Sequence, residues 1–160
     1  MHTIQKSFAL LIAISLFLLI VINYKNYQFS HNPLSKKIYE RISQKENQIR
    51  QKIRLRYGLD IKIEIKIVDK LHENLFGLAT YDDLGKISIL LNKKRFQESE
   101  DYMIEYVLPH EYAHAMMFVL KNFTKQNGGH TKEWQQICIN IGGLKCDRFV
   151  KHNDIIMGKI

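Results

Sequence analysis

The most apolar stretch of the chain runs from Phe8 to Ile22, with Ser15 as its only polar member. Because this stretch is apolar on every face, it is typical of a membrane segment rather than of the core helix of a soluble domain. Its length, about 15 residues, or about 18 with its neighbours, lies between that of a signal-peptide core and that of a short span. Residues 23–27 contain no small-x-small cleavage site. We therefore predict an uncleaved membrane anchor over residues 1–24.

A second apolar pattern has helical spacing and begins after Asn32 and Pro33, which suit the N-cap and first position of a helix. Gly58 suits its end. The apolar positions are Leu34, Ile38, Ile42, Ile49 and Ile53. Residues 23–32 show no periodicity and are typical of a linker. We predict that residues 25–57 form a linker followed by an amphipathic helix.

The middle of the chain carries patterns typical of strands. In residues 60–68, isoleucines alternate with charged residues, as a half-buried strand requires. Residues 77–81 and 86–92 are predicted to form a second strand pair, joined by a turn through the Asp-Asp-Leu-Gly sequence at 82–85. A small antiparallel or mixed sheet is expected.

Two helical patterns complete the chain. The first is predicted over about residues 99–121, where a serine can cap the helix and the acidic pair after it suits the positive end of the helix dipole. After the glycine pair at 128–129, a last helix is predicted over about residues 131–141, with an apolar face and two glycines at its end. The order helix, strands, helices predicts an α+β domain over residues 58–160.

The chain is basic, with a formal charge of +8 over 160 residues. Much of the excess lies in the helix predicted before Gly58, which carries Lys36, Lys37, Arg41, Lys45, Arg50, Lys52, Arg54 and Arg56. Two interpretations stay open: a solvated face opposite the core stripe, or a surface for anionic lipid headgroups beside a membrane anchor. Nucleic acid is a third candidate partner, which we do not favour because a membrane segment precedes the helix.

Two features bear on the compartment. Lys6 and the amino terminus precede the apolar run, whereas Lys25 and the lysine pair at 36–37 follow it. Positive residues are enriched on the cytoplasmic side, so we expect a single-pass membrane protein with its C-terminal domain in the cytoplasm. Cys138 and Cys146 are too few for a disulfide scaffold, and we expect free thiols, with a single bridge as the alternative.

The residues with the clearest chemistry are at 110–114, His-Glu-Tyr-Ala-His, which fits H-E-x-x-H. On a helix His110 and His114 share one face, so both imidazoles can bind one ion. Zinc binds imidazole nitrogen at about 2.0–2.1 Å, and two such ligands make half of a tetrahedral site. Glu111 is turned by about 100° round the helix and can act beside the metal as general base for zinc-activated water. The flanking residues are apolar, and buried polar groups are costly unless a metal or partner satisfies them.

A third ligand is needed. The metzincin extension of the motif is absent, because Met117 and Leu120 stand where its glycine and third histidine should be. His130, at the start of the last predicted helix, and Glu133, one turn later, are both acceptable ligands, and we favour His130. Pro109 removes a backbone donor just before the motif, which predicts a kink or a fresh helix start.

With these motifs, the sequence resembles the SprT-like zinc metallopeptidases. The resemblance covers about residues 77–152 and is carried by the predicted strand 86–92, the segment 107–114 and the segment 130–134 with the helix after it. Pro109 before the first histidine is also found in the family. Thr131 departs from the family pattern, which usually has glycine after the third histidine.

The resemblance implies a zincin-like core of a small sheet, an active-site helix and a following helix. It implies zinc held by His110, His114 and His130, with Glu111 as catalytic base in the hydrolysis of protein or peptide substrates. It also implies that an edge strand of the hairpin holds an extended peptide by strand addition. Eukaryotic relatives cleave proteins crosslinked to DNA, and many members carry a zinc ribbon; because no Cys-x-x-Cys pair follows the core here, we do not carry DNA targeting over.

Two alternatives to a membrane-anchored zinc metallopeptidase stay open. One is a non-enzymatic membrane protein with a closed structural zinc site, for which Cys138 or Cys146 could be the fourth ligand. The other is a DNA-associated protease of the same family. For an oxyanion donor the sequence offers several tyrosines without choosing between them: Tyr81, Tyr102, Tyr106 and Tyr112. The remaining histidines are assigned no role: His2, His31, His72 and His152.

Overall fold

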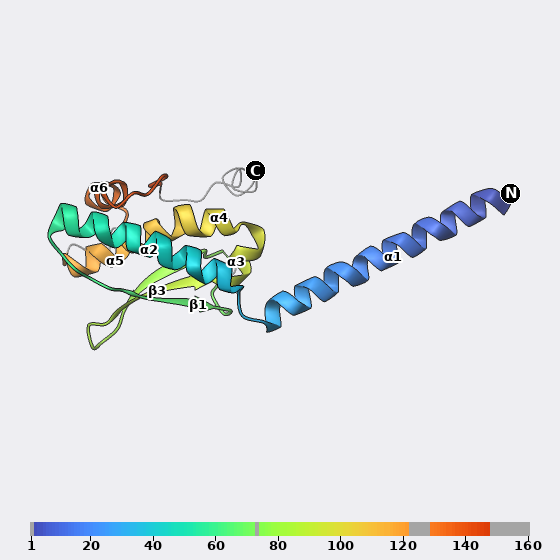
Figure 1. Cartoon of the computed structure of the whole chain (residues 1–160), viewed down its shortest axis with the longest axis horizontal. Coiled ribbons are helices and arrows are strands. Elements are labelled where there is room, and N and C mark those ends of the chain that lie inside the picture. The colour runs from blue at the N-terminus through green and yellow to red at the C-terminus, as the bar shows by residue number, and fades with distance from the viewer. Residues whose placement is uncertain (1, 73, 122–128, 148–160) are drawn as a thin grey trace. The chain divides into compact units, whose positions relative to one another are not determined.

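The computed structural model describes residues 2–72, 74–121 and 129–147, and the chain divides into two compact units, residues 1–34 and 35–160 (Figure 1). The first unit is one helix, α1 (His2–His31). Within its stretch Ile4–His31, the most apolar 18-residue window has a mean hydropathy of 2.4, so the helix is long and apolar enough to cross a membrane, a property that a signal sequence shares.

The predicted linker after the apolar run is wrong in one respect, because α1 continues through it to His31. The end of the helix is held by local contacts, including a ring stack of Tyr27 on His31 with centroids 4.0 Å apart. Asn32 donates its backbone N–H to the Gln28 carbonyl at 3.0 Å, and its side-chain amide donates to the Gln28 side chain at 2.6 Å. The sequence had predicted that Asn32 caps the next helix, but in the structure it ends α1.

The second unit begins with α2 (Lys36–Tyr57), with Ser35 at the N-cap position and Gly58 at the C-cap. The predicted apolar stripe is confirmed by the buried residues Ile38, Ile42, Ile49 and Ile53. The basic face is partly engaged within this unit: Arg41 pairs with Glu100 and Asp101, and Lys45 pairs with Glu105. These ion pairs connect α2 to the later helices, a use of the basic residues that the sequence did not predict.

A three-stranded mixed sheet has the order β1-β3-β2. Its strands are β1 (Glu64–Val68), β2 (Gly77–Tyr81) and β3 (Ile87–Asn92). β1 runs parallel to β3 and β2 antiparallel, so β2 lies at one edge. The hairpin prediction is confirmed. Asp82 shapes the turn, since its carboxylate accepts the backbone N–H groups of Leu84 and Lys86 at 3.0 and 2.8 Å.

The single helix predicted after Ser99 is a continuous helical path in three parts. These are α4 (Glu100–Tyr102), the π-helix η1 (Met103–Val107) and α5 (Leu108–Val119). Ser99 is the predicted N-cap, and its hydroxyl accepts the Tyr102 N–H at 3.2 Å. The Leu108 N–H bonds to the Met103 carbonyl, one residue further back than in an α-helix. Pro109, which has no N–H and crowds the preceding turn, accounts for the wider turn before α5.

The elements form layers. α5 packs on β2 and β3 and also contacts α6 (Lys132–Asn140), while α2 packs against η1, α5 and α6. Figure 1 shows α2 and α5 on the same side of the sheet. Because α5 packs on both of these strands, its buried side faces the sheet. The short helix α3 (Lys93–Glu98), which the sequence pattern did not predict, follows β3 directly.

The prediction of free thiols is wrong, because Cys138 and Cys146 form a disulfide. α6 ends at Asn140, and the glycine pair after it turns the chain back so that the two Cα atoms are 5.9 Å apart. Gly143 makes this approach possible, since a Cβ there would lie 2.5 Å from the Cys138 sulfur and 2.9 Å from the Cys146 sulfur. The spacing of the two cysteines along the sequence does not indicate that the chain turns back in this way.

Candidate metal centre

Three imidazoles converge in the second unit. The Nε2 atoms of His110 and His114 are 3.2 Å apart, and the Nε2 of His130 lies 3.1 Å from that of His114 and 3.2 Å from that of His110. Among the described residues, this is the group that could hold a metal ion. The residues that the sequence singled out are therefore together in space, and their role as zinc ligands stays a prediction.

Two local structures produce the convergence. His110 and His114 are one turn apart on α5, and so share one face of that helix. His130 precedes α6, whose N-cap Thr131 accepts the Trp134 N–H at 3.2 Å through its hydroxyl. Gly129 has a φ of 78°, which a glycine adopts without strain, and it turns the chain into this cap. Thr131, the departure from the family pattern, thus has a local role.

The geometry fits a tetrahedral metal. Bonds of about 2.0–2.1 Å at tetrahedral angles place ligand nitrogens about 3.3–3.4 Å apart, close to the separations here. Hydrogen bonds cannot satisfy the cluster, because each neutral ring nitrogen is either a donor or an acceptor and two of any three must have the same role. A cation accepts lone pairs from all three nitrogens, so the residues present fit a zinc-type site.

Burial keeps these rings in the form that binds metals. Burial, followed by the charge that a protonated His130 would carry, lowers the pKa of His110 to about 4. Burial also lowers the pKa of His114, to about 3, with the neighbouring imidazoles adding to the effect. Both rings are therefore neutral at neutral pH, and a neutral imidazole offers a lone pair to a metal. Glu133, the alternative third ligand, is solvent-exposed and lies outside the cluster.

Glu111 is buried, with 7% of its surface exposed, and lies between α5 and the sheet edge. Its Oε2 accepts the backbone N–H of Ala79 on β2 at 3.0 Å. Burial raises the pKa of this carboxyl to about 8, against the opposing effect of the Ala79 N–H. A bound cation would favour the ionised form. The carboxylate is thus anchored on the edge strand, one residue along α5 from the first imidazole.

The edge of β2 that is turned away from β3 binds Glu111. The Asn92 N–H donates to the Phe76 carbonyl at 2.9 Å, and the Asp82 N–H donates to the Lys86 carbonyl at 3.1 Å, so residues 76 and 82 direct their backbone groups at β3. In an antiparallel ladder every second residue faces the other way. Gly77, Ala79 and Tyr81 therefore turn their backbone groups outward, as the bond from Ala79 to Glu111 confirms.

Sequence reasoning missed two features of this site. Gly77 and Ala79 were read only as strand residues, although Gly77 lies against the side chain of Glu111. Trp134 was read as a packing residue, although its ring contacts all three imidazoles. Small residues in the first strand of the hairpin and a tryptophan four residues after His130 are signals that could have indicated them.

The tyrosines offered as oxyanion donors differ in availability. Tyr112 is fully buried and donates its hydroxyl to Glu46 on α2 at 3.0 Å, and Tyr102 is buried with its ring stacked on Tyr106. Tyr81, at the end of β2, is 60% exposed and the most open of the four. Of the other histidines, His152 lies outside the described residues.

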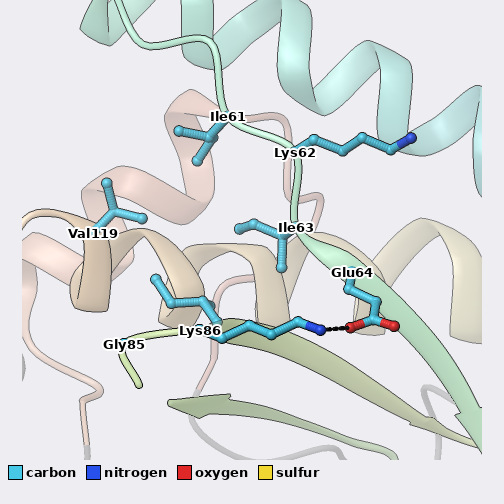
Figure 2. A pocket seen from close by; sticks show the side chains of 8 residues that line it. Ile61, Lys62, Ile63, Glu64, Gly85, Lys86 and Val119 are labelled. Carbon is cyan, nitrogen blue, oxygen red and sulfur yellow. Dashed lines mark ion pairs between the residues drawn. The ribbon is translucent and has the colours of Figure 1, made fainter. Parts of the chain in front are cut away.

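A separate hollow of about 330 Å³ lies between the segment leading into β1, the start of β3 and the end of α5. Figure 2 shows Ile61, Ile63 and Val119 around it and the ion pair between Lys86 and Glu64, at 2.7 Å, along its side. This ion pair lowers the pKa of Glu64. None of the lining residues belongs to the histidine cluster, and we assign the hollow no function.

The α+β unit thus brings together three histidines that could hold a metal ion, two on α5 and one just before α6, with a buried carboxylate and an edge strand beside them. Comparison with protein families is more specific: the SprT-like family matches residues 39–153, most of the chain, and the chain belongs to this family. The match is longer than the stretch that carried the resemblance and takes in most of α2. Searches of the curated proteins and of the solved structures gave no match.

Proposed function

We propose that the chain is a zinc-dependent metallopeptidase that hydrolyses peptide bonds in extended protein or peptide substrates. Membership of the SprT-like family supports a metallopeptidase-like function. The observation that carries the proposal is the meeting of three imidazole nitrogens within 3.2 Å of one another, two of them on the helix that carries a buried carboxylate and the third just before α6. Three protein ligands leave a position for water or substrate, as catalytic zinc sites require.

His110, His114 and His130 would hold the metal. A bound zinc ion supplies Lewis acidity, which polarises the scissile carbonyl and lowers the pKa of a water molecule. Glu111 acts as general base: its carboxylate takes a proton from the water whose oxygen attacks the carbonyl carbon. As the C–N bond breaks, Glu111 returns that proton to the leaving amine. The Ala79 N–H holds the carboxylate in place for both transfers.

The outer edge of β2, which pairs with no other strand of the described residues, gives the substrate its position. An extended peptide that pairs with the outward backbone groups of Gly77, Ala79 and Tyr81 continues the sheet and passes beside Glu111. Backbone pairing of this kind is independent of the substrate's side chains, so the specificity expected is for unfolded or extended segments. The Ala79 N–H stays on Glu111, so at this residue the substrate would pair with the outward carbonyl alone.

The two alternatives are less well supported. A closed structural zinc site would use Cys138 or Cys146 as fourth ligand, but both thiols are in a disulfide, which offers no thiolate. A DNA-associated protease would need the basic face of α2 for phosphates. Arg41 and Lys45 on this face are paired with acidic residues of the same unit, which leaves less charge for nucleic acid.

We also propose that α1 is an uncleaved single-pass anchor and that the catalytic unit lies on the oxidising side of the membrane. The length and hydropathy of α1 support the anchor. The lysines that flank the apolar run favour the cytoplasm, but the disulfide favours an oxidising compartment, because cytosolic thiols are kept reduced. We give the disulfide more weight, because Lys6 and the amino terminus before the apolar run nearly balance the three lysines after it.

The replacement Glu111→Gln tests the mechanism. Glutamine keeps the shape of the side chain but cannot take a proton, so zinc binding should persist while hydrolysis of an unfolded protein substrate falls by about 100-fold or more. Both are measured on the full-length chain in detergent. Glu133→Gln, which changes an exposed carboxylate on the neighbouring helix, is the matched control and should keep full activity. A Glu111→Gln variant as active as the wild type would contradict the mechanism.

A further inference from the structure

One indole contacts the whole metal centre. The ring centroid of Trp134 lies 4.7 Å from that of His110, 5.1 Å from that of His114 and 4.6 Å from that of His130. The indole stacks on His114 with an interplanar angle of 29° and meets the other two rings at steep angles. It is 1% exposed. The three imidazoles therefore share one flat, rigid neighbour.

The same local structure places this indole and the third imidazole. Trp134 is in the first turn of α6, where its backbone N–H bonds to the Thr131 hydroxyl. His130 directly precedes this cap, so the start of α6 fixes the backbone of both residues. Ile137 is buried one turn further along the helix. The packing of α6 against α5 then brings the indole against His110 and His114.

We propose that Trp134 is a positioning residue of the metal centre, which holds the three imidazoles converged before a metal ion arrives. This inference rests on the proposed metal site. Each imidazole can rotate about its own side-chain bonds, and binding must otherwise restrict all three rings at the expense of affinity. The buried indole removes that freedom in advance. Ligands of a metal are usually oriented by a surrounding shell of this kind, most often by hydrogen bonds.

The indole acts here through its shape. Its Nε1 is buried and has no hydrogen-bond partner within the part of the chain that the structure describes. A buried donor without a partner is unfavourable. Because this N–H forms no hydrogen bond with an imidazole, it does not hold the three rings in place. A flat ring without the N–H should therefore keep the function, whereas a flexible aliphatic side chain should lose it. This difference separates positioning from general core packing.

The experiment measures zinc affinity of the full-length chain in detergent, by competition with a chromophoric chelator. Trp134→Leu should bind zinc at least about 10-fold more weakly than the wild type, while Trp134→Phe should stay within about threefold of it. Ile137→Ala is the matched control, because it opens the core on the same helix, one turn beyond Trp134. Ile137→Ala should leave the affinity within about threefold of wild type. Wild-type affinity in Trp134→Leu, or an equal loss in Ile137→Ala, would overturn the proposal.

A second measurement needs no variant, in case Trp134→Leu does not fold. Trp134 is the only tryptophan in the chain, so its fluorescence comes from the site itself. Titration of the metal-free wild type with Co²⁺ should quench this fluorescence in step with binding. Co²⁺ binding without quenching would contradict the contact between the indole and the ligands. A wild type that binds no divalent metal contradicts the proposed function, whereas binding that is unaffected in Trp134→Leu contradicts this inference alone.

Discussion

Gly77 and Glu111 are so close that a Cβ on residue 77 would lie 2.7 Å from the Glu111 Cγ and 3.0 Å from its Oε1. A Cβ contact of 2.7 Å is essentially never found in proteins, so a side chain at residue 77 would force the Glu111 side chain or the strand to shift. The absence of a side chain is what allows Glu111 to pass the strand and reach the Ala79 N–H. A glycine in β2 is therefore part of how the general base is held.

Gly77→Ala should consequently lower peptidase activity by about 100-fold, as displacement of a catalytic group by about 1 Å does, while zinc binding is retained. The measurement is kcat for an unfolded protein substrate beside zinc content of the same preparation. Leu78→Ala, on the same strand with its side chain on the other face, is the control and should keep kcat within about threefold of the wild type. Unchanged kcat in Gly77→Ala would show that the position of Glu111 does not depend on Gly77.

The Tyr112 hydroxyl connects the metal-site helix to α2. Burial, with the nearby Glu46 carboxylate, raises the pKa of Tyr112, so the hydroxyl stays protonated and donates to Glu46. Tyr112→Phe should reduce the free energy of unfolding by about 1.5–3 kcal/mol, the range for a hydrogen bond to a charged group. Urea unfolding of the full-length chain measures this loss. Glu46→Gln keeps an acceptor and should lose less; an equal or larger loss would argue against the hydrogen bond as the cause.

The disulfide should stabilise the second unit. In the chain-entropy model, closing so short a loop lowers the entropy of the unfolded chain, which raises the free energy of unfolding by about 2–3 kcal/mol. Cys138→Ser should therefore lose about that much stability relative to the oxidised wild type, as measured by denaturant unfolding. Cys146→Ser should lose a similar amount, and the double variant no more than either alone. Fully additive losses would indicate that the two sulfurs act separately.

The side of the membrane can be read from the same cysteines. When cells are lysed in a denaturant that contains an alkylating reagent, both cysteines of the full-length chain should stay unmodified until a reductant is added. Cys146→Ser is the control, since it leaves Cys138 without its partner and hence reactive once the protein is unfolded before alkylation. Wild-type thiols that react without reduction would place the unit in a reducing compartment, in agreement with the flanking lysines.

The sequence predicted best those features that depend on neighbours along the chain. The isoleucine stripe of α2 and the helix α6 follow from helical spacing, and the hairpin follows from its turn residues. The two helical imidazoles share a face because the i, i+4 relationship is local. Even His130 was indicated by its place at a helix start after a glycine pair.

The features that were missed depend on contacts between distant segments or on competing local choices. The disulfide needs the turn after α6, and the fit of Gly77 to Glu111 needs the packing of β2 on α5. Asn92 ends β3 and also caps α3, since its side chain accepts the Lys94 N–H at 3.1 Å, and only the first role is apparent from the strand pattern. Asn32 suits a helix start, yet its contacts with Gln28 close the helix before it.

Zinc content of the purified full-length chain tests the metal centre most directly. The wild type and Glu133→Ala should retain stoichiometric zinc after dialysis against a weak chelator, and His130→Ala should lose it, because two helical imidazoles alone do not complete the site. A wild type without zinc would contradict the account. So would a His130→Ala variant that keeps the metal while Glu133→Ala releases it.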